Sequence, residues 1–102
     1  MALRKVAELH QVPVGRVKVV EVEEQELALC NVEGTIYAVA NVCTHDGGPL
    51  GEGCLLDGQV ECPRHGARFD VRTGAARTLP AVIGVPVFPV TLAGEAILVD
   101  LD

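Results

Sequence analysis

Short apolar segments separated by turn residues make up much of the chain, and where apolar and polar residues alternate, the period of two is typical of β-strands. In the segment 16–24, Val17 and Val19 alternate with charged residues, and the apolar positions then continue at Val20. The shift of one residue indicates either a β-bulge or a strand that is buried on both faces. The first residues show only a weak helical pattern without an N-cap, so we expect a strand over residues 2–7 followed by a turn.

Short turn sequences separate the apolar segments. Glu33-Gly34 lies between two apolar runs and predicts a hairpin, and a second hairpin is expected around residues 93–95. Pro86 and Pro89 lack a backbone N–H, so their strand should lie at a sheet edge or be kinked. The expected strand segments are 16–24, 26–32, 35–42, 59–62, 68–72, 85–92 and 96–101. Short strands with frequent turns favour an all-β fold, either an antiparallel β-sandwich or a small barrel.

Composition divides the chain into two kinds of sequence. Residues 1–40 and 83–102 consist of plain strand patterns, whereas residues 41–82 hold most of the glycines, three of the four cysteines and two of the three histidines. A length of 102 residues is typical of one domain. We therefore expect a single domain, 1–102, in which a loop-rich subdomain at about 41–82 is inserted into a β framework.

Charge and hydropathy exclude two classes of function. The net charge is −6, so nucleic acid is an unsuitable partner, because phosphate binding needs a basic face. The apolar runs are far shorter than the roughly 20 residues of a membrane-spanning helix, and the N-terminus shows no signal-peptide pattern. We expect a cytoplasmic protein whose cysteines bind metal instead of forming disulfides.

Two Cys-His pairs lie in glycine-rich segments. Cys43 and His45 form a C-x-H pair, and after 16 residues Cys62 and His65 form a C-x-x-H pair. Catalysis by a reactive thiol would need only one such pair. A zinc finger usually groups Cys with Cys and His with His, but zinc stays open, in a zinc-stabilised interaction module. An iron–sulfur cluster fits the glycines, which let backbone N–H groups approach bridging sulfides.

The segments CTHDGGPLGEG, 43–53, and CPRHGARFDVRTG, 62–74, resemble the two cluster loops of the Rieske [2Fe–2S] family. TLPA, 78–81, is similar to the third, proline-containing loop of that family, and the resemblance spans essentially the whole chain. It implies that one [2Fe–2S] cluster is bound with Cys43 and Cys62 on the inner iron and with His45 and His65 on the outer iron near the surface.

The resemblance also implies a low reduction potential within the family. Gly48 and Arg64 stand where Rieske proteins of respiratory bc complexes have a pair of disulfide-forming cysteines. Ala67 and Phe69 stand where those proteins have a Ser and a Tyr whose hydroxyls donate to sulfur. Without these donors, we expect a potential toward the low end of the roughly −150 to +300 mV Rieske range.

Such a chain resembles the ferredoxin component of bacterial aromatic-ring dioxygenase systems. The resemblance implies a monomeric one-electron carrier between an NAD(P)H-dependent flavin reductase and a terminal oxygenase. It is not expected to be an enzyme, because only His10 remains once the four ligands are assigned, too few for a mononuclear iron site. The alternative within the family is the small subunit of an NADH-dependent nitrite reductase.

The sequence also predicts the environment of four further residues. Cys30 and Cys54 should be packed core residues, and Phe69 should pack under the second cluster loop. Arg64, next to His65, is a candidate for the rim of a docking surface.

Overall fold

A computed structural model describes residues 3–42, 48–63, 66–78 and 83–101. The described chain is almost entirely β, with two single-turn 3₁₀ helices. Its elements are β1 Leu3–Glu8, η1 Leu9–Gln11, β2 Val17–Val22, β3 Gln25–Val32, β4 Thr35–Ala40, η2 Leu50–Glu52, β5 Cys54–Leu56, β6 Gln59–Glu61, β7 Arg68–Asp70, β8 Val87–Phe88, β9 Val90–Ala93 and β10 Ala96–Asp100. Neither described helix is long or apolar enough to cross a membrane.

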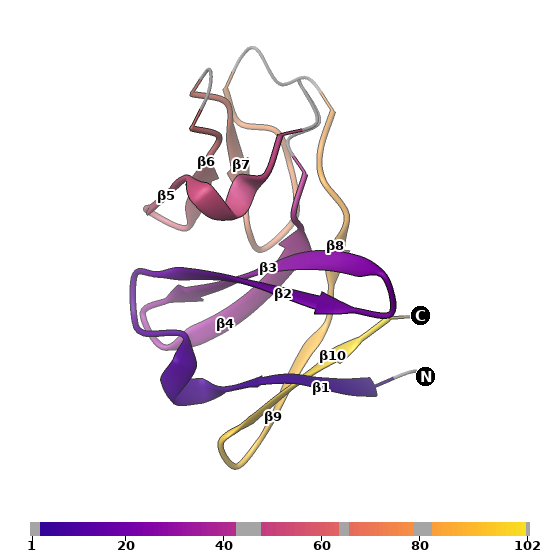
Figure 1. The fold of residues 1–102 in the computed structure, drawn as a ribbon. Helices are drawn as coiled ribbons and strands as arrows, with labels where there is room; N and C mark the ends of the chain where they lie inside the picture. Colours follow the sequence, from indigo (N-terminus) through magenta and orange to yellow (C-terminus); the bar gives the residue numbers. More distant parts are fainter. Residues whose placement is uncertain (1–2, 43–47, 64–65, 79–82, 102) are drawn as a thin grey trace.

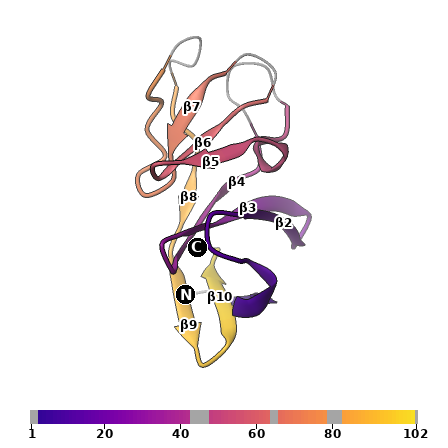
Figure 2. The ribbon, with the colours of Figure 1, turned by 90° about the vertical axis from the view of Figure 1, so that its left-hand side faces the viewer.

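The strands form three antiparallel sheets stacked along the longest axis of the molecule (Figures 1 and 2). The first sheet has the order β1-β10-β9, the second β2-β3-β4-β8 and the third β5-β6-β7. The second sheet lies in the middle, and the third lies at the end opposite to the β9–β10 hairpin. The expected all-β class with antiparallel pairing is therefore confirmed, as are the hairpins at Glu33-Gly34 and at residues 93–95.

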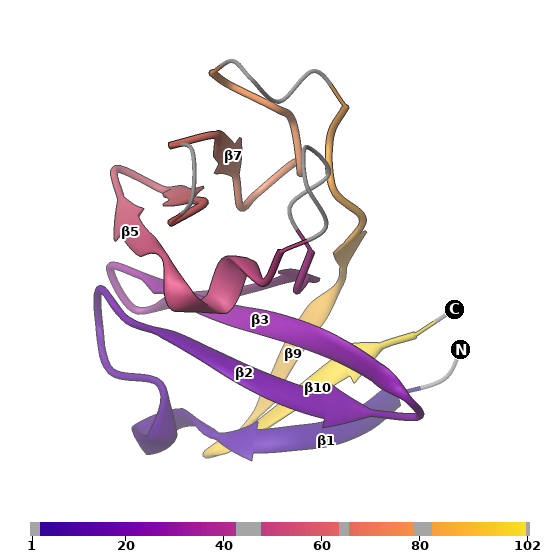
Figure 3. The same cartoon turned by 45° about the horizontal axis from the view of Figure 1, so that its top comes forward.

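Strand β3 lies between two hydrophobic cores. Figure 3 shows the strand between β5 on one side and the strands of the first sheet on the other. Ala28 and Cys30 face a core shared with the third sheet. Leu27 and Leu29 face the other core, shared with the first sheet. All four side chains are fully buried, because successive residues of a strand point to opposite faces and both faces are covered here.

The alternation shift in β2 does not mark a bulge. Its pairing with β3 runs in continuous register from Val17↔Cys30 to Val22↔Gln25. Val17 packs against one core and Val20 against the other, but no side chain of β2 is fully buried and Val19 is exposed. The strand is therefore not buried on both faces: it is an edge strand of the described sheet that is partly covered on each. The register shift of the first sheet lies in β1, between Lys5 and Ala7, and the sequence pattern did not predict it.

Proline ends the regular pairing of the C-terminal strand region, as predicted. Pro89 separates β8 from β9, so that one apolar segment contributes an edge strand to the second sheet and an edge strand to the first. A missing N–H is tolerated at this crossing because no ladder partner is lost there.

One tight turn and one strand were not predicted from the sequence. The β2–β3 hairpin turns through Glu23 and Glu24, both with positive φ, which is uncommon for residues other than glycine, asparagine or aspartate. Strand β5 was not expected either. It forms beside β6 because Gly53 permits a close approach: a Cβ there would lie 1.6 Å from the carbonyl oxygen of Glu61.

Candidate metal centre

Cys62 follows β6 directly and is 1 % exposed. Its N–H donates to the carbonyl oxygen of Ala67 at 2.7 Å, and the N–H of Gly66 donates to the carbonyl oxygen of Cys62 at 3.1 Å. Gly66 has a φ of +75°, a conformation that suits glycine. These hydrogen bonds join the described ends of the β6–β7 connection, defined here as the 62–67 turn, and a buried thiol lies at its start.

The cysteine belongs to the core on the third sheet's side of the molecule. Cys62, Ala67 and Phe69 are members of one buried cluster, and the last two are fully buried. The expectation that Phe69 packs under the second loop is confirmed. A thiolate among apolar side chains is shielded from water, which suits the sulfur ligand of a metal whose positive charge compensates for the burial.

Three of the four predicted ligands, Cys43, His45 and His65, lie outside the described residues, as do Arg64 and Pro80. In the part of the chain that is described, no group of three or more His, Cys, Asp or Glu side chains comes together. The ligand set is therefore carried by the sequence pattern and by the surroundings of Cys62.

Asn41 fixes the described residues on either side of the first Cys-His pair. Its side-chain oxygen accepts the N–H of Gly51 at 2.6 Å, and its side-chain NH₂ donates to Glu26 at 3.2 Å. Its backbone N–H donates to the carbonyl oxygen of Glu26 at 3.0 Å. One side chain thereby joins the end of β4 to η2, across the stretch that contains Cys43 and His45.

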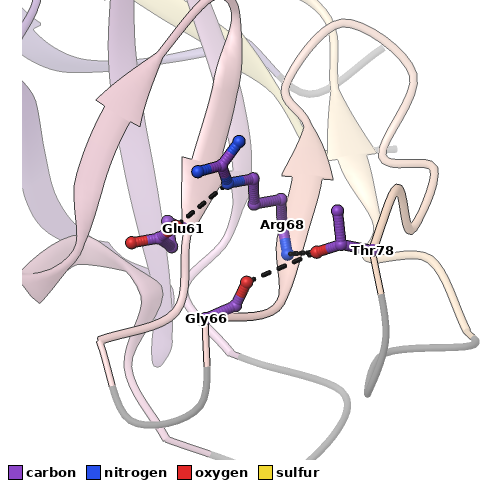
Figure 4. Close-up of polar contacts among 4 residues, drawn as sticks. All are labelled: Glu61, Gly66, Arg68 and Thr78. Carbon is purple, nitrogen blue, oxygen red and sulfur yellow. Dashed lines mark hydrogen bonds and ion pairs between the residues drawn. The ribbon is translucent and has the colours of Figure 1, made fainter.

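Polar contacts also surround the 62–67 turn (Figure 4). Arg68 pairs with Glu61 across β6 and β7 at 2.9 Å, with both side chains partly exposed. The Thr78 hydroxyl accepts the N–H of Arg68 at 2.9 Å and donates to the carbonyl oxygen of Gly66 at 3.3 Å. Sequence analysis missed Thr78 because its partners lie at least ten residues away along the chain.

The carboxylate of Asp70, at the end of β7, is held ionised. Partial burial opposes its ionisation, but the backbone N–H of Arg72 at 2.8 Å and the guanidinium of Arg77 at 3.1 Å outweigh that effect. The pKa of Asp70 therefore lies below its ordinary value.

The two cysteines outside the predicted site differ from each other. Cys30 is buried in β3, as expected, and burial raises the pKa of its thiol to about 12, which makes it a poor nucleophile. Cys54 is exposed, so its expected place in the core is wrong. In β5, whose edge is unpaired within the described sheet, Leu55 faces inward and its neighbours point outward, which the apolar run of residues 54–56 did not reveal.

The donor set fits a [2Fe–2S] cluster of mixed ligation. Two thiolates and two neutral imidazoles with two ferric ions and two sulfides sum to zero charge, and reduction by one electron adds a single negative charge. A four-cysteine cluster would be two charges more negative in each state. Cys62, the described thiol, is buried, as a sulfur ligand at the inner end of such a cluster would be.

Comparisons with known proteins agree with the donor set. A family model described as the Rieske [2Fe–2S] domain matches residues 2–89. The ferredoxin component of a naphthalene 1,2-dioxygenase system from Pseudomonas aeruginosa is 43% identical over 94 residues, which cover 92% of this chain and 90% of that protein. The ferredoxin component of biphenyl 2,3-dioxygenase from Rhodococcus jostii (strain RHA1) is 39% identical over 102 residues, which cover 100% of this chain and 95% of that protein.

Solved structures give the same result. The ferredoxin of carbazole 1,9a-dioxygenase from Nocardioides aromaticivorans IC177 superposes with a TM-score of 0.92 at 35% identity, covering 97% of both chains. A complex of reduced oxygenase and oxidised ferredoxin in carbazole 1,9a-dioxygenase matches with a TM-score of 0.89 at 32% identity, covering 95% of this chain and 91% of that chain. A putative NADH-dependent nitrite reductase small subunit from Mycobacterium tuberculosis reaches 0.85 at 22% identity, covering 96% and 93%, and shares the fold alone.

Proposed function

The chain belongs to the Rieske [2Fe–2S] domain family, and we propose that it passes electrons from an NAD(P)H-dependent flavin reductase to the terminal oxygenase of an aromatic-ring dioxygenase system. It is an electron carrier with one Rieske-type cluster and not a catalyst of substrate chemistry. The observation that carries the proposal is the near full-length identity to ferredoxin components, at 43% over 90% of one such protein.

We assign the cluster ligands as Cys43 and Cys62 for the inner iron, and His45 and His65 for the outer iron. When bound, the cluster supplies reversible uptake of one electron at a time. Burial of Cys62, and the hydrogen bonds that close the 62–67 turn around it, support its role as an inner ligand. Glycine at position 66 allows the turn to reverse directly after the C-x-x-H motif.

We propose that the potential lies at the low end of the Rieske range. Ala67 and Phe69 are fully buried beside Cys62 and carry no hydroxyl to donate to sulfur. The reduced, more negative cluster then receives less stabilisation than it would from hydroxyl donors. A low potential suits a carrier that must pass electrons onward to an oxygenase.

The alternatives receive less support. Likeness to nitrite reductase small subunits rests on the fold, at 22% identity, whereas likeness to dioxygenase ferredoxins extends to sequence. The zinc-stabilised interaction module is not supported, because the matching family binds an iron–sulfur cluster.

We further propose a cytoplasmic monomer that meets its partners through charge. Among the described residues, Cys30, Cys54 and Cys62 form no disulfide, which is compatible with a reducing compartment. The net charge of −6 favours fast encounter with basic patches on the reductase and the oxygenase.

The test has two stages. Protein assembled anaerobically with iron and sulfide should contain two of each per chain and give Rieske-type electron paramagnetic resonance on reduction; a colourless zinc protein would refute the cluster assignment. The loaded protein should then transfer electrons from a flavin reductase to an aromatic-ring dioxygenase oxygenase. Transfer to a nitrite reductase large subunit alone would favour the alternative.

A further inference from the structure

Thr78 joins two segments that lie far apart in the chain. Its Oγ1 accepts the N–H of Arg68 at 2.9 Å, and the same hydroxyl donates to the carbonyl oxygen of Gly66, twelve residues earlier, at 3.3 Å. Figure 4 shows the threonine side chain directed toward both backbone groups. The acceptor and the donor capacity of the hydroxyl are both used, which a methyl group could not reproduce.

The first of these bonds replaces a backbone bond. Residues 75–77 run beside β7, and the N–H of Arg77 donates to the carbonyl oxygen of Arg68 at 2.8 Å. In a continued antiparallel ladder, the N–H of Arg68 would return a bond to the carbonyl of Arg77. The Thr78 side chain takes that N–H instead, so the chain can leave β7 at this point while the amide of Arg68 keeps an acceptor.

The second bond reaches the turn that carries the proposed ligands. Gly66 immediately follows His65, and its N–H donates to the carbonyl oxygen of Cys62. Its own carbonyl accepts the Thr78 proton. The hydroxyl is therefore bonded to the far end of the same short turn whose near end holds the buried cysteine.

We propose that Thr78 is a positioning residue for the cluster: its hydroxyl holds the 62–67 turn against the segment that leads into residues 79–82. This inference rests on the proposed assignment of Cys62 and His65 as ligands. In this proposal, retention of the cluster depends on the side chain of Thr78, which is exposed and is not one of the proposed ligands.

The test compares three variants of the loaded protein. Thr78→Val removes the hydroxyl and keeps the branched shape, and Thr78→Ser keeps the hydroxyl. Thr73→Val is the matched control, because Thr73 is an exposed threonine of the same subdomain whose Oγ1 accepts only a local bond, from the N–H of Ala75 at 3.1 Å.

Loss of the cluster to an iron chelator should be roughly 2- to 10-fold faster in Thr78→Val, the factor that corresponds to the net contribution of one hydrogen bond to local opening. Its reduced-state paramagnetic resonance should broaden or shift. The paramagnetic resonance reports on the metal site and would not respond to a change in overall stability alone. Thr78→Ser and Thr73→Val should match the wild type in both measurements.

Equal bleaching rates and spectra for wild type and Thr78→Val would overturn the inference while leaving the proposed function intact. Equal effects of Thr73→Val would overturn it too, since any threonine of the subdomain would then serve. If Thr78→Val takes up no cluster, the serine variant decides between the outcomes. Wild-type loading of both Thr78→Ser and Thr73→Val supports the role of the Thr78 hydroxyl, and a Thr78→Ser variant that also takes up no cluster contradicts it. A wild-type chain that takes up no iron–sulfur cluster would refute the proposed function and this inference together.

Discussion

Introducing a hydroxyl at two buried positions, through Ala67→Ser and Phe69→Tyr, should raise the reduction potential of this carrier. The carbonyl of Ala67 accepts the N–H of Cys62 at 2.7 Å, and both substituted residues share a buried cluster with that cysteine. We expect a new hydroxyl among these buried side chains to donate its hydrogen bond to sulfur. Donation to sulfur stabilises the reduced state more than the oxidised state, because the reduced cluster carries the extra negative charge.

The magnitude follows from the net value of one hydrogen bond. If each bond favours the reduced state by about 0.5–1.5 kcal/mol, a one-electron couple shifts upward by about 20–65 mV per hydroxyl. A hydroxyl that finds no partner at these fully buried positions would instead destabilise the protein by about 1–3 kcal/mol. For a chain of this size, each kcal/mol lowers the melting temperature by roughly 4–8 °C.

Voltammetry and thermal unfolding of the loaded protein separate the two outcomes. Phe88→Tyr is the matched control, because Phe88 is the other phenylalanine and packs in the core on the far side of β3. Its potential should stay at the wild-type value. A double variant that melts earlier with no rise in potential would show that positions 67 and 69 do not face the cluster sulfur, and an equal rise in Phe88→Tyr would remove the specificity of the argument.

Three further predictions concern the ligands, the cores and acid stability. Cys62→Ser should abolish the visible spectrum and the bound iron, whereas Cys54→Ser, at an exposed position, should retain both in metal analysis. Leu29→Ala should lower the free energy of unfolding by about 2–5 kcal/mol in urea. Circular dichroism and cluster absorbance should be lost together, because β3 packs in both cores. Two separate transitions would contradict this coupling of the cores through β3. Asp70→Asn should be less stable than wild type at neutral pH, because the pKa of Asp70 is lower in the folded state than the unfolded value of about 3.9. The difference in the free energy of unfolding between the two proteins should disappear as the pH falls through the folded pKa. A difference that stays constant from pH 7 to about 3 in urea titrations would contradict this.

Local sequence was sufficient for most strands and for the family. Alternation of apolar and charged residues predicted β2, and apolar segments bounded by turn sequences predicted β3, β4 and β10. The dipeptide Glu33-Gly34 predicted its hairpin because a glycine lowers the cost of a tight reversal. The two Cys-His pairs and their spacing led to the family that the comparisons confirm.

Local signals failed where a conformation depends on distant neighbours. Glu23 and Glu24 adopt positive φ because the pairing of β2 with β3 demands a two-residue turn there, not because glutamate favours it. Cys54 was expected inside because cysteine is usually buried, but the pairing of β5 with β6 turns its side chain outward. An average preference of a residue type does not determine which face of a strand meets the core.

By itself, then, the sequence determined most of the strands, the antiparallel class and the family, since all three are encoded in residue type and short-range spacing. Only the tertiary structure decided that β3 separates two cores, that Asn41 links the end of β4 to η2, and that Thr78 bonds to Gly66 across twelve residues. Those features come from packing between segments that are distant in the chain. A strand pattern specifies that one face is apolar, and the partner that covers that face is chosen only when the sheets assemble.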